Sequence, residues 1–143
     1  MRSVDVNVCV YAHRRESDRH VDYRRWLDDA RRGPEPLGLF PVVLSGFLRV
    51  VTHPKVFLDP TPLDQAWAFV HALVAAPAVH VVGPGQRHLG LFEEACRTGG
   101  ASGNLVPDAF LASLAMENNA TWYSADRGFA RYPGLRWRHP LDG

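Results

Sequence analysis

The candidate metal-binding and catalytic residues are three aspartates, Asp5, Asp108 and Asp126, whose carboxylates lie in or near apolar segments of the sequence. Asp5 lies in an apolar run near the start of the chain, Asp126 closely follows another apolar run, and Asp108 follows a proline that can begin a helix. An ionised carboxylate in apolar surroundings is costly unless a cation pairs with it. Neighbouring carboxylates also repel one another unless a divalent cation neutralises them. The pattern therefore predicts a site for a hard cation, Mg²⁺ or, in its place, Mn²⁺.

Two of these aspartates also have a simpler interpretation. Asp5 alone could cap or turn the chain where a strand ends, and Asp108 could complement a helix dipole from the first turn. At about 100° per residue, however, Asp108 lies opposite Glu117 and within the sector of Leu111 and Ala112, so we expect it to face inward. A dipole role explains the position of Asp108 but not this direction.

Alternating predicted strands and helices would position these residues. We expect strands over residues 3–12, 37–40, 79–82, 121–124 and 135–139, and helices over 20–32, 42–52, 62–76, 85–97 and 107–118. Thr61 is the expected N-cap of the third helix. This order predicts a three-layer α/β/α sandwich around a mostly parallel sheet of about four to five strands. Ligands of such folds bind at the carboxyl ends of the strands, where we expect the three aspartates to meet.

The composition predicts one globular domain without a membrane span. The chain has 143 residues, 46% of them hydrophobic, and no apolar run approaches the ~18 residues that a span needs. We recognise no export signal, and Cys9 and Cys96 lack metal-ligand spacing, so we expect a cytoplasmic protein whose cysteines are buried small hydrophobes. The net charge is only +1, but Lys55 is the one lysine among 16 basic residues. The arginines could either bind phosphates or cover solvated helix faces.

Three segments, residues 5–8, 103–112 and 124–130, resemble the acidic blocks of the PIN domain, and specifically of VapC-type ribonuclease toxins of toxin–antitoxin systems. The resemblance covers essentially all of residues 1–143, as a single PIN domain. It implies an α/β/α sandwich that cleaves RNA with Mg²⁺ or Mn²⁺ held by a cluster of acids. It also implies a homodimer, and a cognate VapB-type antitoxin whose C-terminal tail inserts near the site.

The expected mechanism is metal-assisted hydrolysis of an RNA phosphodiester, in which an ion held by the three aspartates activates a water molecule. Asn104 and Ser124 could orient the acids or the water, and Asn7 could support the site or turn the chain. Arg49 is a candidate phosphate contact, with an arginine that merely extends from a helix into solvent as the alternative.

Two acids that many relatives carry are missing from this chain. Gly46 stands where the helix after the second strand would carry a glutamate, and Gly128 stands two residues after Asp126, where a second acid often occurs. These losses favour one bound metal ion over two. Glu93 and Glu94 could substitute, although solvent-facing helix acids are the simpler interpretation of this pair.

Rival classes remain to be weighed against a nuclease. Phosphotransferase and response-regulator domains also place aspartates at strand ends, but both require a lysine late in the chain. The one lysine here, Lys55, lies in the first half, which argues against both classes. The stronger rival is a PIN-like module that binds RNA or an antitoxin without cleaving RNA.

The helix predicted over residues 62–76 carries more apolar surface than one face against a core requires. We therefore expect a homodimer that uses part of this helix. The residues concerned are Trp67, Phe69, Val70 and Leu73.

Overall fold

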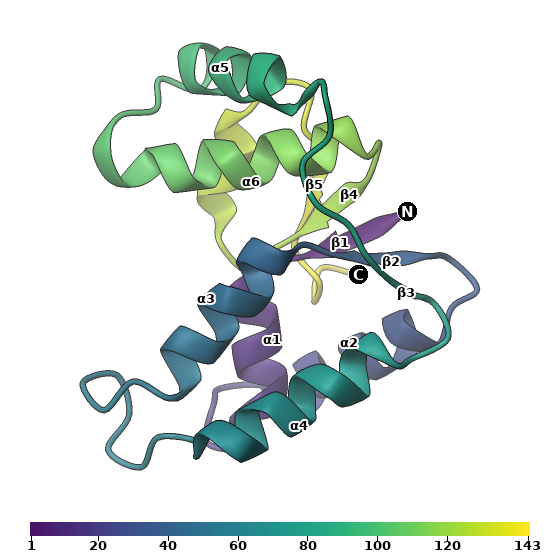
Figure 1. Cartoon of the computed structure of the whole chain (residues 1–143), viewed down its shortest axis with the longest axis vertical. Coiled ribbons are helices and arrows are strands. Elements are labelled where there is room, and N and C mark those ends of the chain that lie inside the picture. The colour runs from purple at the N-terminus through teal and green to yellow at the C-terminus, as the bar shows by residue number, and fades with distance from the viewer.

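A parallel five-stranded sheet organises the computed structural model, which describes residues 1–143 (Figure 1). The strand order is β3-β2-β1-β4-β5, and every neighbouring pair is parallel. The strands are β1 (Arg2–Val4), β2 (Leu37–Leu39), β3 (Val79–Val81), β4 (Thr121–Tyr123) and β5 (Trp137–Arg138). The predicted fold class is thus confirmed, with β1 in the centre of the sheet and β4 beside it.

Helices cover both faces of this sheet. They are α1 (Val6–His13), α2 (His20–Arg32), α3 (Pro41–Val51), α4 (Leu63–Val74), α5 (His88–Thr98) and α6 (Val106–Glu117). The first four lie on one side of the sheet and α5 and α6 on the other (Figure 1). No helix combines the length and the apolar character needed to cross a membrane.

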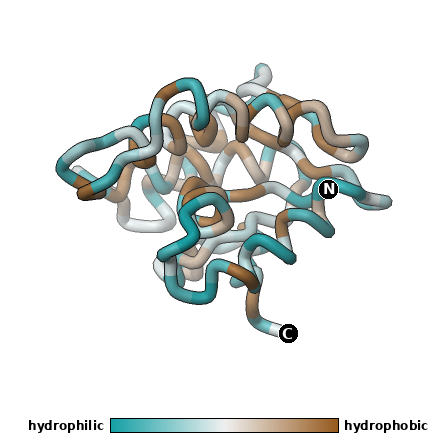
Figure 2. Tube along the Cα trace, turned by 90° about the horizontal axis from the view of Figure 1, so that it is seen from below, coloured by the Kyte–Doolittle hydropathy of each residue, from teal (hydrophilic) through white to brown (hydrophobic).

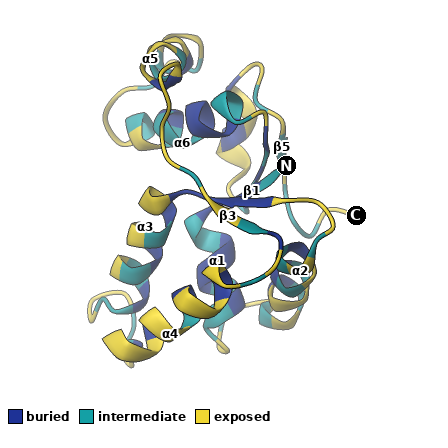
Figure 3. Cartoon of the chain, turned by 45° about the vertical axis from the view of Figure 1, so that its right-hand side comes forward, coloured by how far each residue is buried: buried dark blue, intermediate teal, exposed yellow.

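Two hydrophobic cores, one on each side of the sheet, hold the layers together. The larger one packs Val4 and Leu39 of the strands against helices α1 to α4. The smaller one surrounds Trp122, a fully buried residue of β4 that stacks on Phe40 with ring centroids 6.0 Å apart. Buried residues accordingly line the sheet and the inner helix faces, whereas much of α4 is exposed (Figure 3). The trace coloured by hydropathy likewise has hydrophobic stretches through its middle (Figure 2).

The first predicted strand, residues 3–12, is wrong beyond its second residue, Val4. β1 ends at Val4, and the chain then turns into α1 with Asp5 as its N-cap. The Asp5 carboxylate accepts a hydrogen bond from the backbone N–H of Val6, which is how an aspartate begins a helix. α1 is apolar on most of its surface, because four of its eight residues are buried: Val8, Cys9, Val10 and Ala12. A short apolar run of this kind cannot be assigned to strand or helix from periodicity alone.

Thr61 does not cap the helix that follows it. α4 begins at Leu63, and its N-cap Pro62 makes no side-chain capping bond. The buried Thr61 hydroxyl instead accepts a hydrogen bond from Arg14 Nη1 at 3.1 Å and lies 3.0 Å from His13 Nε2. Thr61 therefore fastens the loop between α3 and α4 to the end of α1.

Candidate active site

Asp5 lies at the carboxyl end of the central strand, where the chain leaves β1 and enters α1. Its side chain is buried and held on both oxygens. Oδ1 accepts the Val6 N–H at 2.7 Å, and Oδ2 accepts the hydroxyl of Ser124 at 2.6 Å. Asp5 is thus fixed in one orientation by its own helix and by the neighbouring strand.

Ser124 joins the ends of the two central strands. Its fully buried hydroxyl donates to Asp5 and accepts from the Asp126 backbone N–H at 3.0 Å and from Asn7 Nδ2 at 3.3 Å. Asn7 in turn accepts the Ala125 N–H through Oδ1 at 3.2 Å. Asn7 belongs to α1, not to a strand, and it ties this helix to the segment after β4. The structure therefore brings Asn7 and Ser124, two predicted supporting residues, into one hydrogen-bond network with Asp5.

Asp126 and Asp108 approach this network from the segment after β4 and from α6. Asp126 caps the short 3-10 helix Arg127–Arg131 by accepting the Gly128 N–H at 2.8 Å, and it is exposed. Asp108 lies in the first turn of α6, as predicted, and is half-buried. Its carboxylate makes no hydrogen bond or ion pair within the chain, so its oxygens remain available to a ligand.

The charges of the three aspartates influence one another. Burial, with a smaller contribution from the negative charges of Asp108 and Asp126, raises the pKa of Asp5 from its ordinary value of 3.8 to about 6, against the hydrogen bonds from Ser124 and Val6 that lower it. Burial and the charge of Asp126 raise the pKa of Asp108, while the cation of Arg131 lowers it. The site therefore carries more negative charge than its own cations balance, which is the condition that a bound cation relieves.

The donor set suits a hard divalent cation. Carboxylate oxygens surrounded by uncompensated negative charge are the ligands that Mg²⁺ and Mn²⁺ prefer, whereas zinc favours histidine and cysteine. No group of three or more His, Cys, Asp or Glu side chains is placed to hold one ion together. Asp5, Asp108 and Asp126 are the residues that would supply the oxygens, with water and substrate completing the shell.

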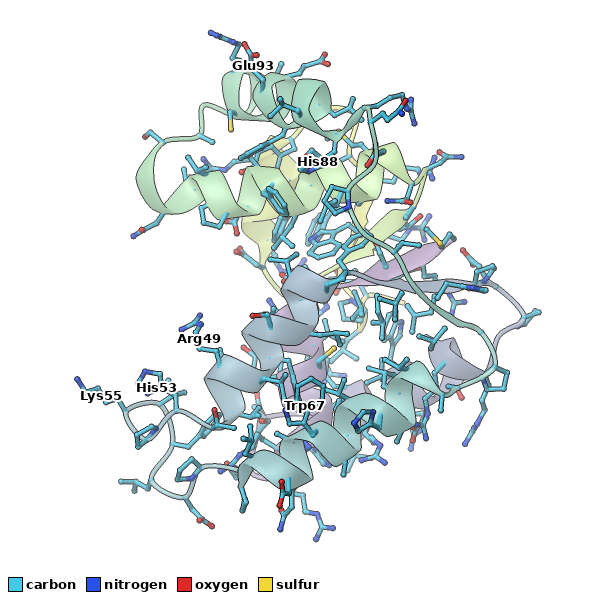
Figure 4. All side chains as sticks on the ribbon, viewed as in Figure 1. Arg49, His53, Lys55, Trp67, His88 and Glu93 are labelled. Carbon is cyan, nitrogen blue, oxygen red and sulfur yellow. The ribbon has the colours of Figure 1, made fainter.

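Other predicted residues lie apart from the aspartates. Asn104 is exposed in the 3-10 turn Gly103–Leu105 and makes no side-chain hydrogen bond to them. Arg49 extends from α3 into solvent without an ion pair (Figure 4). Glu93 lies on the outer side of α5, where it pairs with Arg97 (Figure 4), and Glu94 is also exposed. We therefore do not retain the glutamates as substitutes for the missing acids.

The two glycines that replace expected acids both lie beside the site. A Cβ atom at position 46 would come within 2.8 Å of a Val6 methyl group, so this position faces the first residue of α1. A Cβ atom at position 128 would lie 3.0 Å from Asp126 Oδ1. The geometry is consistent with side chains at these positions pointing toward the aspartates, and both are closely filled by their neighbours.

Two features of the site escaped prediction. Arg131 is the cation whose charge acts on Asp108, and only the general clustering of arginines pointed to it. A cavity of about 380 Å³ also opens beside Asp5, between α1 and the loop that follows α3. A strand over residues 6–12 would place Val6 and Val10 on the face opposite Tyr11, whereas in the helix α1 all three line this cavity.

The comparisons with known proteins agree with this architecture. Residues 3–135 match the model of the PIN domain family. Ribonuclease VapC43 of Mycobacterium tuberculosis strain H37Rv is 54% identical over 143 residues, which is 100% of this chain and 97% of the relative. Ribonuclease VapC25 of the same strain is 38% identical over 96% of each chain.

Solved structures share the fold at low sequence identity. VapBC2 from Rickettsia felis, bound to a DNA fragment from its promoter, has a TM-score of 0.72 at 18% identity and covers 96% of this chain and 97% of that chain. VapBC-1 from nontypeable Haemophilus influenzae has a TM-score of 0.68 at 14% identity, with 97% of both chains covered. From the family match and the full-length identity, the chain belongs to the PIN domain family and, within it, to the VapC proteins.

Proposed function

We propose that this chain is a ribonuclease toxin of a VapBC-type toxin–antitoxin system, and that it hydrolyses RNA phosphodiester bonds with Mg²⁺, or Mn²⁺ in its place. Membership of the VapC proteins supports the ribonuclease activity. The metal requirement rests on one observation, the uncompensated negative charge that Asp108 and Asp126 exert on the buried Asp5, although the three side chains are not gathered around one point in this structure. A purely RNA-binding module would have no use for such a charge, which repels phosphate.

Each aspartate has a distinct part in holding the ion. Asp5 is immobilised by Val6 and Ser124, so it provides a fixed oxygen in a buried position. Asp126 keeps its second oxygen free, since only Oδ1 accepts the Gly128 N–H. Asp108 is free of hydrogen bonds and can adjust to the ligand. Together these residues would hold a divalent ion, which would supply Lewis-acid polarisation of the phosphate and a more acidic water molecule as the nucleophile.

Arg131 places a positive charge beside the aspartates, which would otherwise only repel a phosphate. Its guanidinium acts on Asp108 and is anchored by donating to the Gly128 carbonyl at 3.3 Å. A phosphate bound next to the aspartates would gain from this cation, because charge-assisted hydrogen bonds to phosphate are about twice as strong as neutral ones. Arg131 thus fits a phosphate-binding role better than Arg49, which shows no link to the aspartates.

We also propose a VapB-type antitoxin and a second copy of the chain as partners. The solved structures with this fold are toxin–antitoxin complexes, which supports the antitoxin. Leu63, Trp67 and Val74 form an exposed apolar stripe along α4, which supports a homodimer. Val70 and Leu73, predicted to share in the interface, are instead buried in the core.

Cleavage by the purified protein tests the proposal. Labelled RNA is incubated with metal-free protein, then with added Mg²⁺ or Mn²⁺, beside the variant Asp108→Asn. We expect cleavage only with metal, and none by the variant. Equal cleavage in excess chelator would refute the metal requirement. Tight RNA binding without any cleavage under all conditions would instead identify a binding module.

A further inference from the structure

The cavity beside Asp5 follows α1 away from the aspartates. Asp5, Asn7 and Tyr11 line it from α1, and Val50, Val56 and Phe57 line it from the opposite side. Val56 and Phe57 belong to the loop that follows α3, whose outer part carries His53 and Lys55 (Figure 4). At 1.5 Å per residue, Asp5 and Tyr11 are about 9 Å apart along the helix. We call this cavity the α1 groove.

The walls of the α1 groove are apolar and accessible. Val56 is 53% exposed although it lines the groove. Phe57 is half-buried, and the guanidinium of Arg14 stacks over its ring at 4.2 Å from the centroid. The groove volume of about 380 Å³ falls within the range of small-ligand sites, about 300–1,000 Å³. An apolar, aromatic-walled opening of this size next to a carboxylate site has the shape of a subsite.

A second, polar cavity continues from the end of α1. It measures about 540 Å³, and its charged lining residues are Arg14, Arg15 and Arg24 together with the carboxylates Glu16 and Asp59. Arg14 thus belongs to both features, since it stacks on Phe57 of the groove and lines the polar cavity. Arg15 is exposed and makes no ion pair or hydrogen bond through its side chain. The sequence of features along α1 is therefore carboxylates, apolar groove and guanidinium groups.

We propose that the α1 groove binds a nucleobase of the RNA substrate next to the cleaved bond, and that Arg15 binds the phosphate beyond that base, while Arg14 stays paired with Glu16 and Thr61 and holds the Phe57 ring. This inference rests on the proposed ribonuclease function. A nucleotide combines a flat π-face with an anionic phosphate, and single-stranded RNA is recognised by stacking on aromatic rings and on arginine planes. The groove and its cationic end offer these two kinds of contact in the same order.

Two matched variants test the nucleobase subsite. Val56→Asp places a charge in the groove, whereas Leu58→Asp places the same charge two residues away on a fully exposed side chain outside it. The probe is a short, fluorescein-labelled, single-stranded oligoribonucleotide of random sequence, and all variants carry Asp108→Asn so that the probe stays intact. We expect Val56→Asp to weaken binding about tenfold, the size of one lost base-stacking contact. Leu58→Asp should change it by less than about twofold.

An abasic probe separates the base from the backbone. The same oligoribonucleotide without its nucleobases should bind the Asp108→Asn protein about tenfold more weakly than the intact probe. Adding Val56→Asp should not lower the affinity for this abasic probe any further. If Val56→Asp weakens both probes equally, or matches Leu58→Asp with the intact probe, the groove does not hold a base. If Val56→Asp spares RNA but abolishes binding of a VapB-type antitoxin, the groove is a peptide site and the inference is refuted.

A second pair of variants tests the phosphate end. Arg15→Gln and Arg25→Gln each remove an exposed arginine without an ion pair, the first beside the polar cavity and the second on α2. We expect Arg15→Gln to reduce the slope of log affinity against log salt by about 0.7, the value for one phosphate contact on a single strand. Arg25→Gln should leave the slope unchanged, and equal slopes for both variants would refute the assignment. Cleavage by the wild type is measured separately, so failure of the subsite is distinct from failure of the proposed ribonuclease.

Discussion

The buried carboxylate of Asp5 should make the metal-free protein less stable as the pH rises. Its folded pKa of about 6 exceeds the ordinary value of 3.8 that applies after unfolding. The proton therefore leaves the unfolded chain first, and ionised Asp5 destabilises the fold above about pH 6 but not below about pH 4. At about 1.36 kcal/mol per pKa unit, the full cost is about 3 kcal/mol.

The variant Asp5→Asn removes this charge but disturbs the network around it. Ser124 already accepts two donors, so an amide N–H facing its hydroxyl would be a third and one hydrogen bond would be lost. That loss costs about 1–3 kcal/mol at every pH. The stability of Asp5→Asn relative to wild type should nevertheless rise by about 2 to 3 kcal/mol between pH 4 and pH 7.5, because only the wild type gains the buried charge.

Urea unfolding in the presence of a chelator measures this difference. Both proteins are unfolded at a series of pH values, with Asp18→Asn as a variant that removes an exposed carboxylate without a hydrogen bond. The relative stability of Asp18→Asn should vary far less with pH than that of Asp5→Asn. A stability difference between Asp5→Asn and wild type that does not change from pH 4 to pH 7.5 would show that Asp5 is not a strained, buried charge.

Four further outcomes follow from the same geometry. Mg²⁺-dependent cleavage should fall about tenfold per pH unit below about pH 6, because Asp5 must be ionised to bind the metal, and a pH–rate profile checks this. Ser124→Ala leaves the partly buried donors Asn7 Nδ2 and Asp126 N–H without this partner, so chemical unfolding should show a loss of about 1–3 kcal/mol, and the acid limb of the pH–rate profile should move to higher pH. The proposed homodimer predicts that the wild type sediments as a dimer and Trp67→Arg as a folded monomer at tens of micromolar protein, since the exposed Trp67 ring lies on the apolar stripe of α4. Gly46→Glu should destabilise the fold by about 1–3 kcal/mol through its contact with Val6, whereas Gly46→Glu combined with Val6→Ala should fold and bind Mg²⁺ more tightly by calorimetry.

The fold was predictable because its layers follow directly from the order of apolar strands and amphipathic helices. α2, for example, was expected over residues 20–32 and occupies His20–Arg32. The strand order could not be read from that pattern, because pairing depends on which edges meet in three dimensions. The α1 groove was also inaccessible to sequence reasoning. It exists because the Thr61 N–H donates to the Val51 carbonyl at 2.8 Å and draws the intervening loop back against α1, a contact without any local signal.

The sequence offered two interpretations of Asp5, a residue that caps or turns the chain and a cation ligand, and in the structure one side chain can serve as both. As a cap, Asp5 uses only Oδ1, which accepts the Val6 N–H in the first turn of α1, while Oδ2 accepts the Ser124 hydroxyl at the end of β4. The cap is what turns the chain after only three residues of β1, and that turn keeps the carboxylate at the strand end where Asp126 and Asp108 approach. Removing the capping function would therefore also displace the carboxylate that we propose as a metal ligand. At Asp5, the hydrogen bond that begins α1 therefore also fixes the position of the carboxylate in the site.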